Sequence, residues 1–165
     1  LRSRGGRRPH RRVAGGGTEP PPDPEYDVGV FKHDSDGTVK RPAGLREPQG
    51  VVAAGGRTGL FDDVVGWGFT LALRGVDPLQ SLSAVQRAFL ERIGCHVVQL
   101  GSEPGPGVTV ECDDAYERFC SEHGIIGFLS RPDFRIFAGV SDPADLPELV
   151  ADLERQLYVL PADSA

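Results

Sequence analysis

The sequence contains no methionine, one tryptophan and three cysteines among its 165 residues. Because translation starts at methionine and this chain begins with Leu1, we expect the sequence to be a fragment or a processed piece. No stretch approaches the roughly 20 consecutive apolar residues that a membrane span requires. The basic N-terminus is not followed by the apolar segment of a signal peptide. The sequence therefore predicts a protein with neither a membrane-spanning nor a secretory segment.

Cysteine is scarce and widely spaced along the chain. Cys95, Cys112 and Cys120 are an odd number without a close pair, which is typical of a protein in a reducing cytoplasm. A thiol oxidoreductase needs two thiols close enough to exchange, usually as Cys-x-x-Cys where a strand meets a helix. No such pair occurs, so we reject redox catalysis. We expect Cys95 and Cys120 to be buried and Cys112 to be exposed.

Sequence motifs for metal and nucleotide binding are also missing. Cys95, His96, Cys112 and His123 lack the short CxxC or HxxxH spacing of zinc sites, so we predict no metal site. Neither GxGxxG after a strand nor GxxxxGK[ST] occurs, and no GxSxG elbow supports a catalytic serine. We therefore assign no catalytic, cofactor-binding or metal-ligating residue in this chain.

Charge is distributed unevenly. The formal net charge is −6, but residues 1–12 carry six arginines and no acid, which leaves 12 basic residues against 24 acidic ones in the remaining chain. An acidic folded part repels phosphate, so we expect no nucleic-acid partner. The arginine cluster could bind an anionic surface, but a solvated, unstructured end is the favoured interpretation.

The first third of the chain reads as irregular. Residues 1–41 are rich in Gly and Pro and lack apolar periodicity, so they are predicted to be disordered or irregular. Residues 42–65 are predicted to form an entry arm that leads into the folded domain of residues 66–160. Within this entry arm we expect a short strand at Val51–Ala54, a tight turn at residues 55–58 and one helical turn at residues 62–65.

The domain itself is predicted to contain three helices. Asp77-Pro78 is a cap followed by proline at the first helical position, and Gly124 ends the second helix. The third helix starts either at Asp142-Pro143 or at Asp145, which forms a possible capping box with Glu148. These signals and the apolar spacing predict a helix over residues 78–93, a second that is capped by Asp113 or Asp114 and ends at Gly124, and a third that runs from one of these two starts to Leu157.

Four apolar runs are predicted to be strands, at residues 69–73, 95–100, 125–129 and 134–140. The first two are joined through a helix and should be parallel. The last two flank a short corner around Pro132 and should form an antiparallel hairpin. This βαβαββα order predicts a thioredoxin-like α/β fold, a mixed four-stranded sheet with helices on both faces.

Three side chains could contact a partner, two at the predicted hairpin corner and one at the start of the first predicted strand. Arg131 and Asp133 could hold an anion, but shaping the turn is the favoured interpretation, with Arg131 solvated or paired to a nearby acid. Trp67 stands between two glycines at the start of a strand. We expect it to belong to the core or to an interface instead of stacking on a ligand.

Three stretches together resemble one protein family. They are residues 42–44 through GGRTGLFDD (55–63), then VVGWGFTLAL (64–73) and FLSRPDFRIFAG (128–139). They are similar to the C-terminal region of the flavin-dependent aromatic hydroxylases, especially the group of 3-(3-hydroxyphenyl)propionate hydroxylase and related phenol-type monooxygenases. The similarity covers residues 42–158 and departs from the family pattern at Phe134-Arg135.

The resemblance implies a parent enzyme that binds FAD, takes hydride from NADH or NADPH and uses O₂ to hydroxylate a phenolic ring. It also implies that this chain is the accessory C-terminal domain, which contacts the catalytic FAD domain of the same parent chain or forms a homodimer contact. No family catalytic residue falls within residues 1–165, so we expect this chain to bind no cofactor by itself. The alternative is a stand-alone, redox-inactive thioredoxin-like interaction module.

Overall fold

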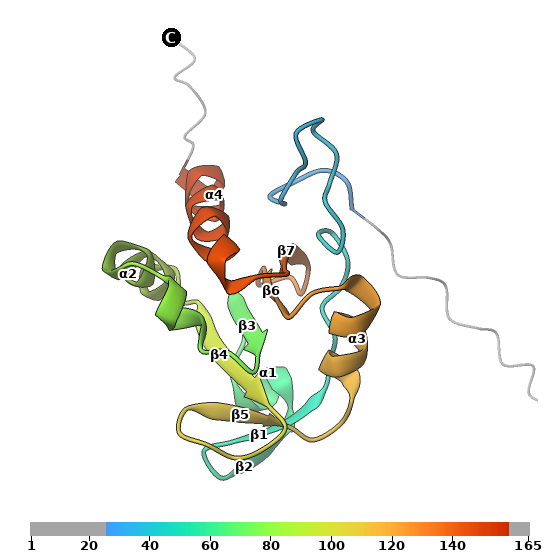
Figure 1. The fold of residues 1–165 in the computed structure, drawn as a ribbon, viewed down its shortest axis with the longest axis vertical. Coiled ribbons are helices and arrows are strands. Elements are labelled where there is room, and N and C mark those ends of the chain that lie inside the picture. Colours follow the sequence, from blue (N-terminus) through green and yellow to red (C-terminus); the bar gives the residue numbers. More distant parts are fainter. Residues whose placement is uncertain (1–25, 159–165) are drawn as a thin grey trace, which may run out of the picture.

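The computed structural model describes residues 26–158 (Figure 1). The predictions for the arginine cluster and for the other residues before 26 lie outside this range. The elements, in chain order, are β1 (Val51–Ala54), β2 (Arg57–Leu60), α1 (Phe61–Val64), β3 (Thr70–Arg74), the 3-10 helix η1 (Pro78–Ser81), α2 (Ala84–Arg92), β4 (His96–Gly101), β5 (Val108–Glu111), α3 (Ala115–His123), β6 (Gly127–Ser130), β7 (Ile136–Val140), the 3-10 helix η2 (Pro143–Asp145) and α4 (Leu146–Tyr158).

The strands form one mixed sheet of seven strands in the order β2-β1-β5-β4-β3-β6-β7. The prediction of four strands is therefore wrong, because β5, β1 and β2 extend the sheet beyond β4. The predicted pairings within the sheet are confirmed: β3 and β4 are parallel, and β6 and β7 are antiparallel. β6 also pairs antiparallel with β3, which joins the hairpin to the parallel pair. The thioredoxin-like assignment itself stays a prediction.

The β1–β2 hairpin corrects the predicted turn at residues 55–58. Gly55 and Gly56 alone form the connection, with φ of +57° and +76°, and this is the two-residue turn that suits a hairpin. Arg57–Leu60 is consequently a strand that pairs with β1. Its side chains are mostly exposed, so it lacks the apolar alternation by which a strand is found in a sequence.

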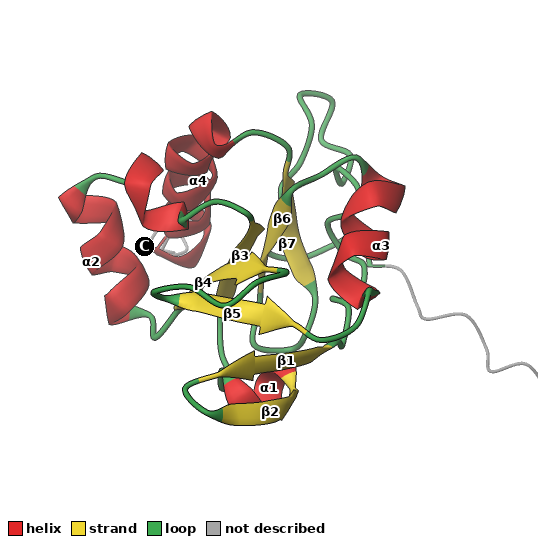
Figure 2. Ribbon diagram, turned by 60° about the horizontal axis from the view of Figure 1, so that its bottom comes forward, coloured by secondary structure: helices red, strands yellow, loops and turns green. Residues whose placement is uncertain are grey.

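Helices cover both faces of the sheet, as predicted (Figure 2). Leu71 and Leu73 of β3 pack into one core with α2 and α4. Ala72, between them in sequence, belongs to a second core with α1 and α3. This follows from the period-two alternation of side chains along a strand. Each face of the central strands is therefore buried under its own pair of helices.

Two helix starts differ from the prediction. The helix expected over residues 78–93 is divided into η1 and α2, because Ser83 begins a new helix through a capping box with Gln86. Asp77 caps only the short η1, accepting a hydrogen bond from the Leu79 amide. Before α4, Asp142 is the cap, accepting from the Ala144 amide at 2.8 Å. Asp145 lies inside η2, so the cap at Asp142 replaces the expected capping box at Asp145.

The segment of residues 26–50, here called the arm, runs along the outer edge of β7 (Figure 1). The Lys32 amide donates to the Phe137 carbonyl at 2.9 Å, and the Gly44 amide donates to the Ile136 carbonyl at 2.8 Å. Ile136 in turn donates to the Leu45 carbonyl at 2.9 Å. The arm thus covers an edge strand that would otherwise expose unpaired backbone groups.

The close pairing of β3 and β6 gives a test of the core. A Cβ on Gly127 would collide with the Ala72 carbonyl oxygen, whereas a Cβ on Gly59 would make ordinary contact with Val64 at 3.6 Å. We expect Gly127→Ala to lower the free energy of unfolding by about 3 kcal/mol or more, and Gly59→Ala to change it by less than about 1 kcal/mol. Urea denaturation followed by circular dichroism measures both, and equal effects would contradict the described packing.

Candidate functional site

The turn between β6 and β7, residues 130–135, is here called the hairpin corner. Arg131 donates its backbone amide to the Arg135 carbonyl at 2.8 Å, and Phe134 donates to the Arg131 carbonyl at 3.0 Å. Phe134 is the non-glycine residue with a positive φ, +60°, among the described residues. A left-handed conformation costs a bulky residue free energy. The corner is therefore held in its shape by the contacts around it.

Arg131 links this corner to the arm. Its guanidinium pairs with the Asp133 carboxylate at 2.6 Å, and its Nη1 donates to the Val30 carbonyl at 3.3 Å. The same group lies over the Phe31 ring, 4.7 Å from its centroid, as a cation–π contact. The expected ion pair within the turn is thus present. Arg131 also attaches a segment that lies 100 residues earlier in the chain.

The first described residue also lies at the corner. The Arg135 guanidinium is 4.7 Å from the centroid of the Tyr26 ring. A shallow depression between the arm and the corner is lined by Tyr26, Val28, Arg131 and Arg135, among others. The chain therefore enters the described structure at the hairpin corner.

Trp67 is held beside the corner and projects outward. Gly66 and Gly68 have φ of +119° and +152°, and a Cβ on Gly66 would come within 2.8 Å of the His96 ring. The indole Nε1 donates to the Pro132 carbonyl at 2.7 Å. The side chain is nevertheless 70% exposed. Of the two predicted locations for Trp67, the core is therefore wrong, and the interface stays a prediction.

A buried carboxyl group lies beneath the corner. Glu47 is 8% exposed and its amide donates to the Phe134 carbonyl. Among the described residues, four buried side-chain oxygens have no hydrogen-bond partner: Glu47 Oε2, Asp62 Oδ1, Glu111 Oε1 and Ser130 Oγ. Desolvation raises the pKa of Glu47 to about 7; the nearby Ser130 hydroxyl opposes this rise, and the Asp62 charge adds to it. Sequence reasoning missed this group because its burial depends on the fold of the arm.

The expected burial of Cys120 and exposure of Cys112 are confirmed, whereas Cys95 is less buried than predicted. Cys120 is buried, Cys95 is half-buried and Cys112 is exposed, and all three are free thiols. Burial raises the pKa of Cys95 to about 12 and that of Cys120 to about 11. These two thiols are therefore protonated and unreactive near neutral pH.

Two of the histidines, His96 and His123, have structural contacts. His96 lies against the Trp67 loop, its Nε2 3.2 Å from the Trp67 carbonyl oxygen. The His123 ring packs on Phe119, with centroids 4.5 Å apart. Within residues 26–158 no three His, Cys, Asp or Glu side chains form a group that could hold a metal ion. None of the helices in this range has the length and apolar character needed to cross a membrane.

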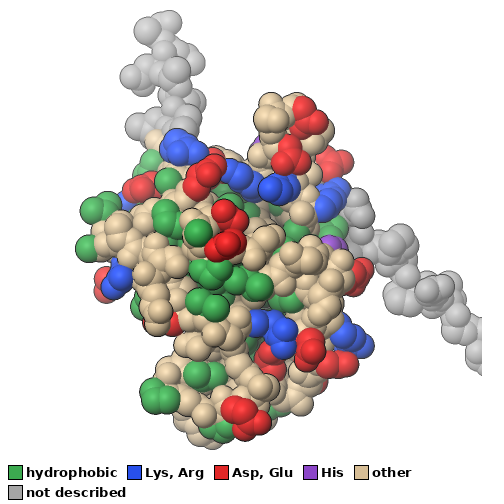
Figure 3. All heavy atoms as spheres, viewed as in Figure 1, with side chains coloured by type: hydrophobic (Ala, Val, Ile, Leu, Met, Phe, Trp, Pro, Cys, Tyr) green, Lys and Arg blue, Asp and Glu red, His purple; other side chains and the backbone are tan. Residues whose placement is uncertain are grey.

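A groove of about 330 Å³ lies between the arm, the end of α3, β7 and the start of α4. It is lined by Lys40, Arg41, His123 and Glu148, among others. Figure 3 shows Lys and Arg side chains interspersed with acidic ones between α4 and the arm. The groove is thus lined by side chains of both charges and by apolar side chains such as Ile125 and Leu149.

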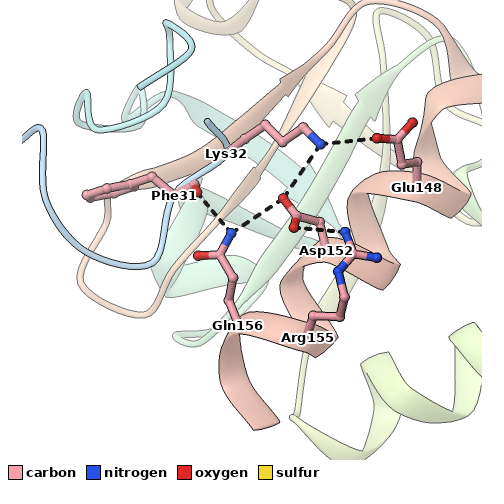
Figure 4. A network of polar contacts seen from close by, with 6 residues as sticks. All are labelled: Phe31, Lys32, Glu148, Asp152, Arg155 and Gln156. Carbon is pink, nitrogen blue, oxygen red and sulfur yellow. Dashed lines mark hydrogen bonds and ion pairs between the residues drawn. The ribbon is translucent and has the colours of Figure 1, made fainter. Parts of the chain in front are cut away.

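Lys32, at this groove, belongs to a network that fastens the arm to α4 (Figure 4). Its ammonium lies 3.3 Å from a Glu148 carboxylate oxygen and 3.6 Å from one of Asp152. Gln156 donates to the Phe31 carbonyl at 3.0 Å. Because Lys32 is already paired, we interpret this network as a clamp that holds the arm in place.

The turn after β3 does not fit an FAD pyrophosphate. Such a group binds at a glycine-rich turn after a strand, where free amides at a helix N-terminus receive it. The turn after β3 leads into the four-residue η1, and the Asp77 carboxylate already accepts the Leu79 amide at 3.0 Å. A second anion would be repelled at this position.

Comparison with known proteins identifies what this chain is similar to. The model of the HcaD C-terminal domain family matches residues 44–156. The probable NADH-specific resorcinol 4-hydroxylase of Rhodococcus jostii (strain RHA1) is 28% identical over 123 residues. This alignment covers 70% of the chain and 22% of the hydroxylase. The chain therefore spans about a fifth of the length of this relative.

Two solved structures are similar in fold. One is the flavin-dependent monooxygenase PieE in complex with FAD and substrate, with a TM-score of 0.52 and 21% identity over 80% of this chain and 25% of that protein. The other is aklavinone-11 hydroxylase with FAD and aklavinone, also with a TM-score of 0.52 and 21% identity, over 81% and 26%. At this identity the likeness shows a common fold.

The raised pKa of Glu47 predicts a pH-dependent stability. Because folded Glu47 keeps its proton up to about pH 7 and the unfolded chain loses it near 4.5, the protein loses stability as the pH rises between these values. As the pH rises across this range, we expect the free energy of unfolding of Glu47→Gln to increase relative to that of the wild type by up to about 3 kcal/mol. Urea denaturation at pH 4 and pH 8 measures this, with Glu122→Gln on the exposed side of α3 as the control. Parallel pH profiles for wild type and Glu47→Gln would contradict it.

The contacts of Arg131 predict that it secures the arm. Arg131→Ala removes a hydrogen bond, an ion pair and a cation–π contact, so we expect it to lower the free energy of unfolding by about 2 kcal/mol. Hydrogen exchange at the Lys32 amide should accelerate in parallel. The control Arg118→Ala removes an exposed ion pair with Asp114 at 3.2 Å. It should lower the free energy of unfolding by less than about 0.5 kcal/mol. An unchanged Lys32 amide in Arg131→Ala would show that Arg131 does not hold the arm.

Proposed function

We propose that this chain, which belongs to the HcaD C-terminal domain family, is the C-terminal domain of an FAD-dependent aromatic-ring monooxygenase. The observation that carries this proposal is the family match over residues 44–156. The curated relative and two structural neighbours that are hydroxylases or flavin-dependent monooxygenases support it. The chain covers only 22–26% of these proteins, so the activity concerns a longer parent protein.

The parent reaction that we propose is hydroxylation of a phenolic ring with O₂ and a reduced nicotinamide cofactor. The curated relative is named as an NADH-specific resorcinol hydroxylase, which supports NADH as the hydride donor and a single phenolic ring as the substrate class. A substrate such as 3-(3-hydroxyphenyl)propionate belongs to this class. The free thiols support a cytoplasmic location.

We propose further that this domain does not bind FAD and acts as an accessory part of the parent. The turn after β3 supports this, because Asp77 occupies the amide that a pyrophosphate would need. The burial that raises the pKa of the Cys95 and Cys120 thiols supports the absence of disulfide chemistry. Its role would then be to contact the catalytic FAD domain of the same chain, or a second subunit.

The absence of an FAD site can be tested on the 165-residue chain alone. We expect equilibrium dialysis against FAD to give no saturable binding, and the purified protein to be colourless and unable to oxidise NADH. The parent protein, expressed from the reading frame that continues upstream of Leu1, is expected to retain about one FAD per chain. It should oxidise NADH faster when a phenolic substrate is added.

Two results would contradict different parts of this proposal. Stoichiometric FAD on the 165-residue chain would contradict the accessory role. A parent protein without FAD, or a start codon a few codons before Leu1, would contradict the monooxygenase assignment. The latter result would favour a stand-alone interaction module.

A further inference from the structure

We propose that Trp67 and the hairpin corner form the docking surface for the part of the parent chain that precedes these 165 residues. The inference rests on the proposed function, because it takes that preceding part to be the catalytic FAD domain. It goes further by assigning the contact to one corner of the domain and to one anchor residue.

The first step is that Trp67 is exposed and yet held in a fixed orientation. Its ring is 70% exposed, while its indole N–H is already satisfied by the Pro132 carbonyl at 2.7 Å. What remains directed outward is therefore apolar surface. A large aromatic ring buries much apolar area when it is covered, and tryptophan is enriched among the residues that dominate interface energies.

The second step is that the loop around Trp67 is preorganised. Both flanking glycines have positive φ values, and a Cβ on Gly66 would lie 2.8 Å from His96. The His96 ring therefore fills the space beneath the loop, and its Nε2 contacts the Trp67 carbonyl at 3.2 Å. An anchor that is rigid before binding loses little conformational entropy when a partner covers it.

Val85, another exposed apolar side chain, does not share these features. Val85 on α2 is 74% exposed, but it is small, and single exposed apolar residues are common on protein surfaces. Its aliphatic side chain carries no hydrogen-bonding group that could fix its orientation, and it stands on a helix whose other exposed residues are mainly polar. Val85 is therefore a suitable control for exposure alone.

The third step concerns the occupant. Tyr26, where the described chain begins, lies against Arg135 of the corner, and the next segment is fastened to Arg131 through Val30 and Phe31. The described chain therefore begins at the same hairpin corner that holds Trp67 through Pro132. In a C-terminal domain that covers about a quarter of a related protein, most of the chain precedes it. A covalently attached partner has a high effective concentration, which favours this occupant over a second copy.

The test follows the exposure of Trp67 in the isolated chain and in the intact parent. Both proteins are labelled with 5-fluorotryptophan, and the Trp67 signal in the ¹⁹F spectrum is assigned by its loss in Trp67→Phe. The shift of this signal between H₂O and D₂O reports contact with solvent. We expect a full solvent shift in the 165-residue chain and a reduction of at least threefold in the parent. An equal shift in both proteins would overturn the proposal.

A variant experiment tests whether the contact holds the two parts together. A specific protease site is inserted at Gly15–Gly17 of the parent, and the cleaved protein is passed through a gel-filtration column. We expect the two parts to elute together in the unsubstituted protein and in Val85→Ala, and to separate in Trp67→Ala. Circular dichroism of Trp67→Ala in the 165-residue chain checks that the domain is still folded. Joint elution of the folded Trp67→Ala variant would contradict the proposal.

The remaining outcomes separate this inference from the proposed function. If the isolated chain loses its solvent shift as its concentration rises, a second copy covers Trp67 and the proposed occupant is wrong. If the parent contains FAD but Trp67 stays exposed, the docking surface is wrong and the proposed function stands. If the parent contains no FAD, the proposed function fails whatever the state of Trp67.

Discussion

The outer edge of β7 needs hydrogen-bond partners, and the arm supplies them. Gly44 and Leu45 exchange backbone hydrogen bonds with Ile136, and Lys32 donates to Phe137. An uncovered edge would be able to pair with another chain. Because the arm must lie along this edge, its path is fixed, and so is the place where the chain enters the domain.

This path brings several features to the hairpin corner. The beginning of the arm is held by Arg131 and Arg135, and its later part buries Glu47 beneath Phe134. Trp67 is held at the same corner through the Pro132 carbonyl. One corner therefore combines chain entry, a buried carboxyl group and an exposed aromatic ring. The proposed role of the domain is to contact the rest of its parent, and the hairpin corner is the surface that we assign to this contact.

The sequence predicted the elements whose signals are local and strong. The hairpin around Pro132, the parallel pair β3–β4 and the end of α3 at Gly124 all depend on apolar runs or on residues with restricted backbone angles. The strand Arg57–Leu60 was missed, because an exposed strand has no apolar alternation. The prediction of a single helix over residues 78–93 was wrong. The capping box at Ser83 starts a new helix there, although the apolar spacing continues through this position. The exposure of Trp67 and the burial of Glu47 arise from contacts between segments far apart in sequence, which periodicity does not report.

Hydrogen–deuterium exchange in the parent protein and in the 165-residue chain tests most directly whether this corner faces the catalytic part. The two proteins are compared segment by segment under identical conditions. We expect the segments of residues 65–69 and 131–135 to exchange more slowly in the parent, and α2 (Ala84–Arg92) to exchange equally in both. Slower exchange in α2 with an unchanged hairpin corner would contradict this arrangement.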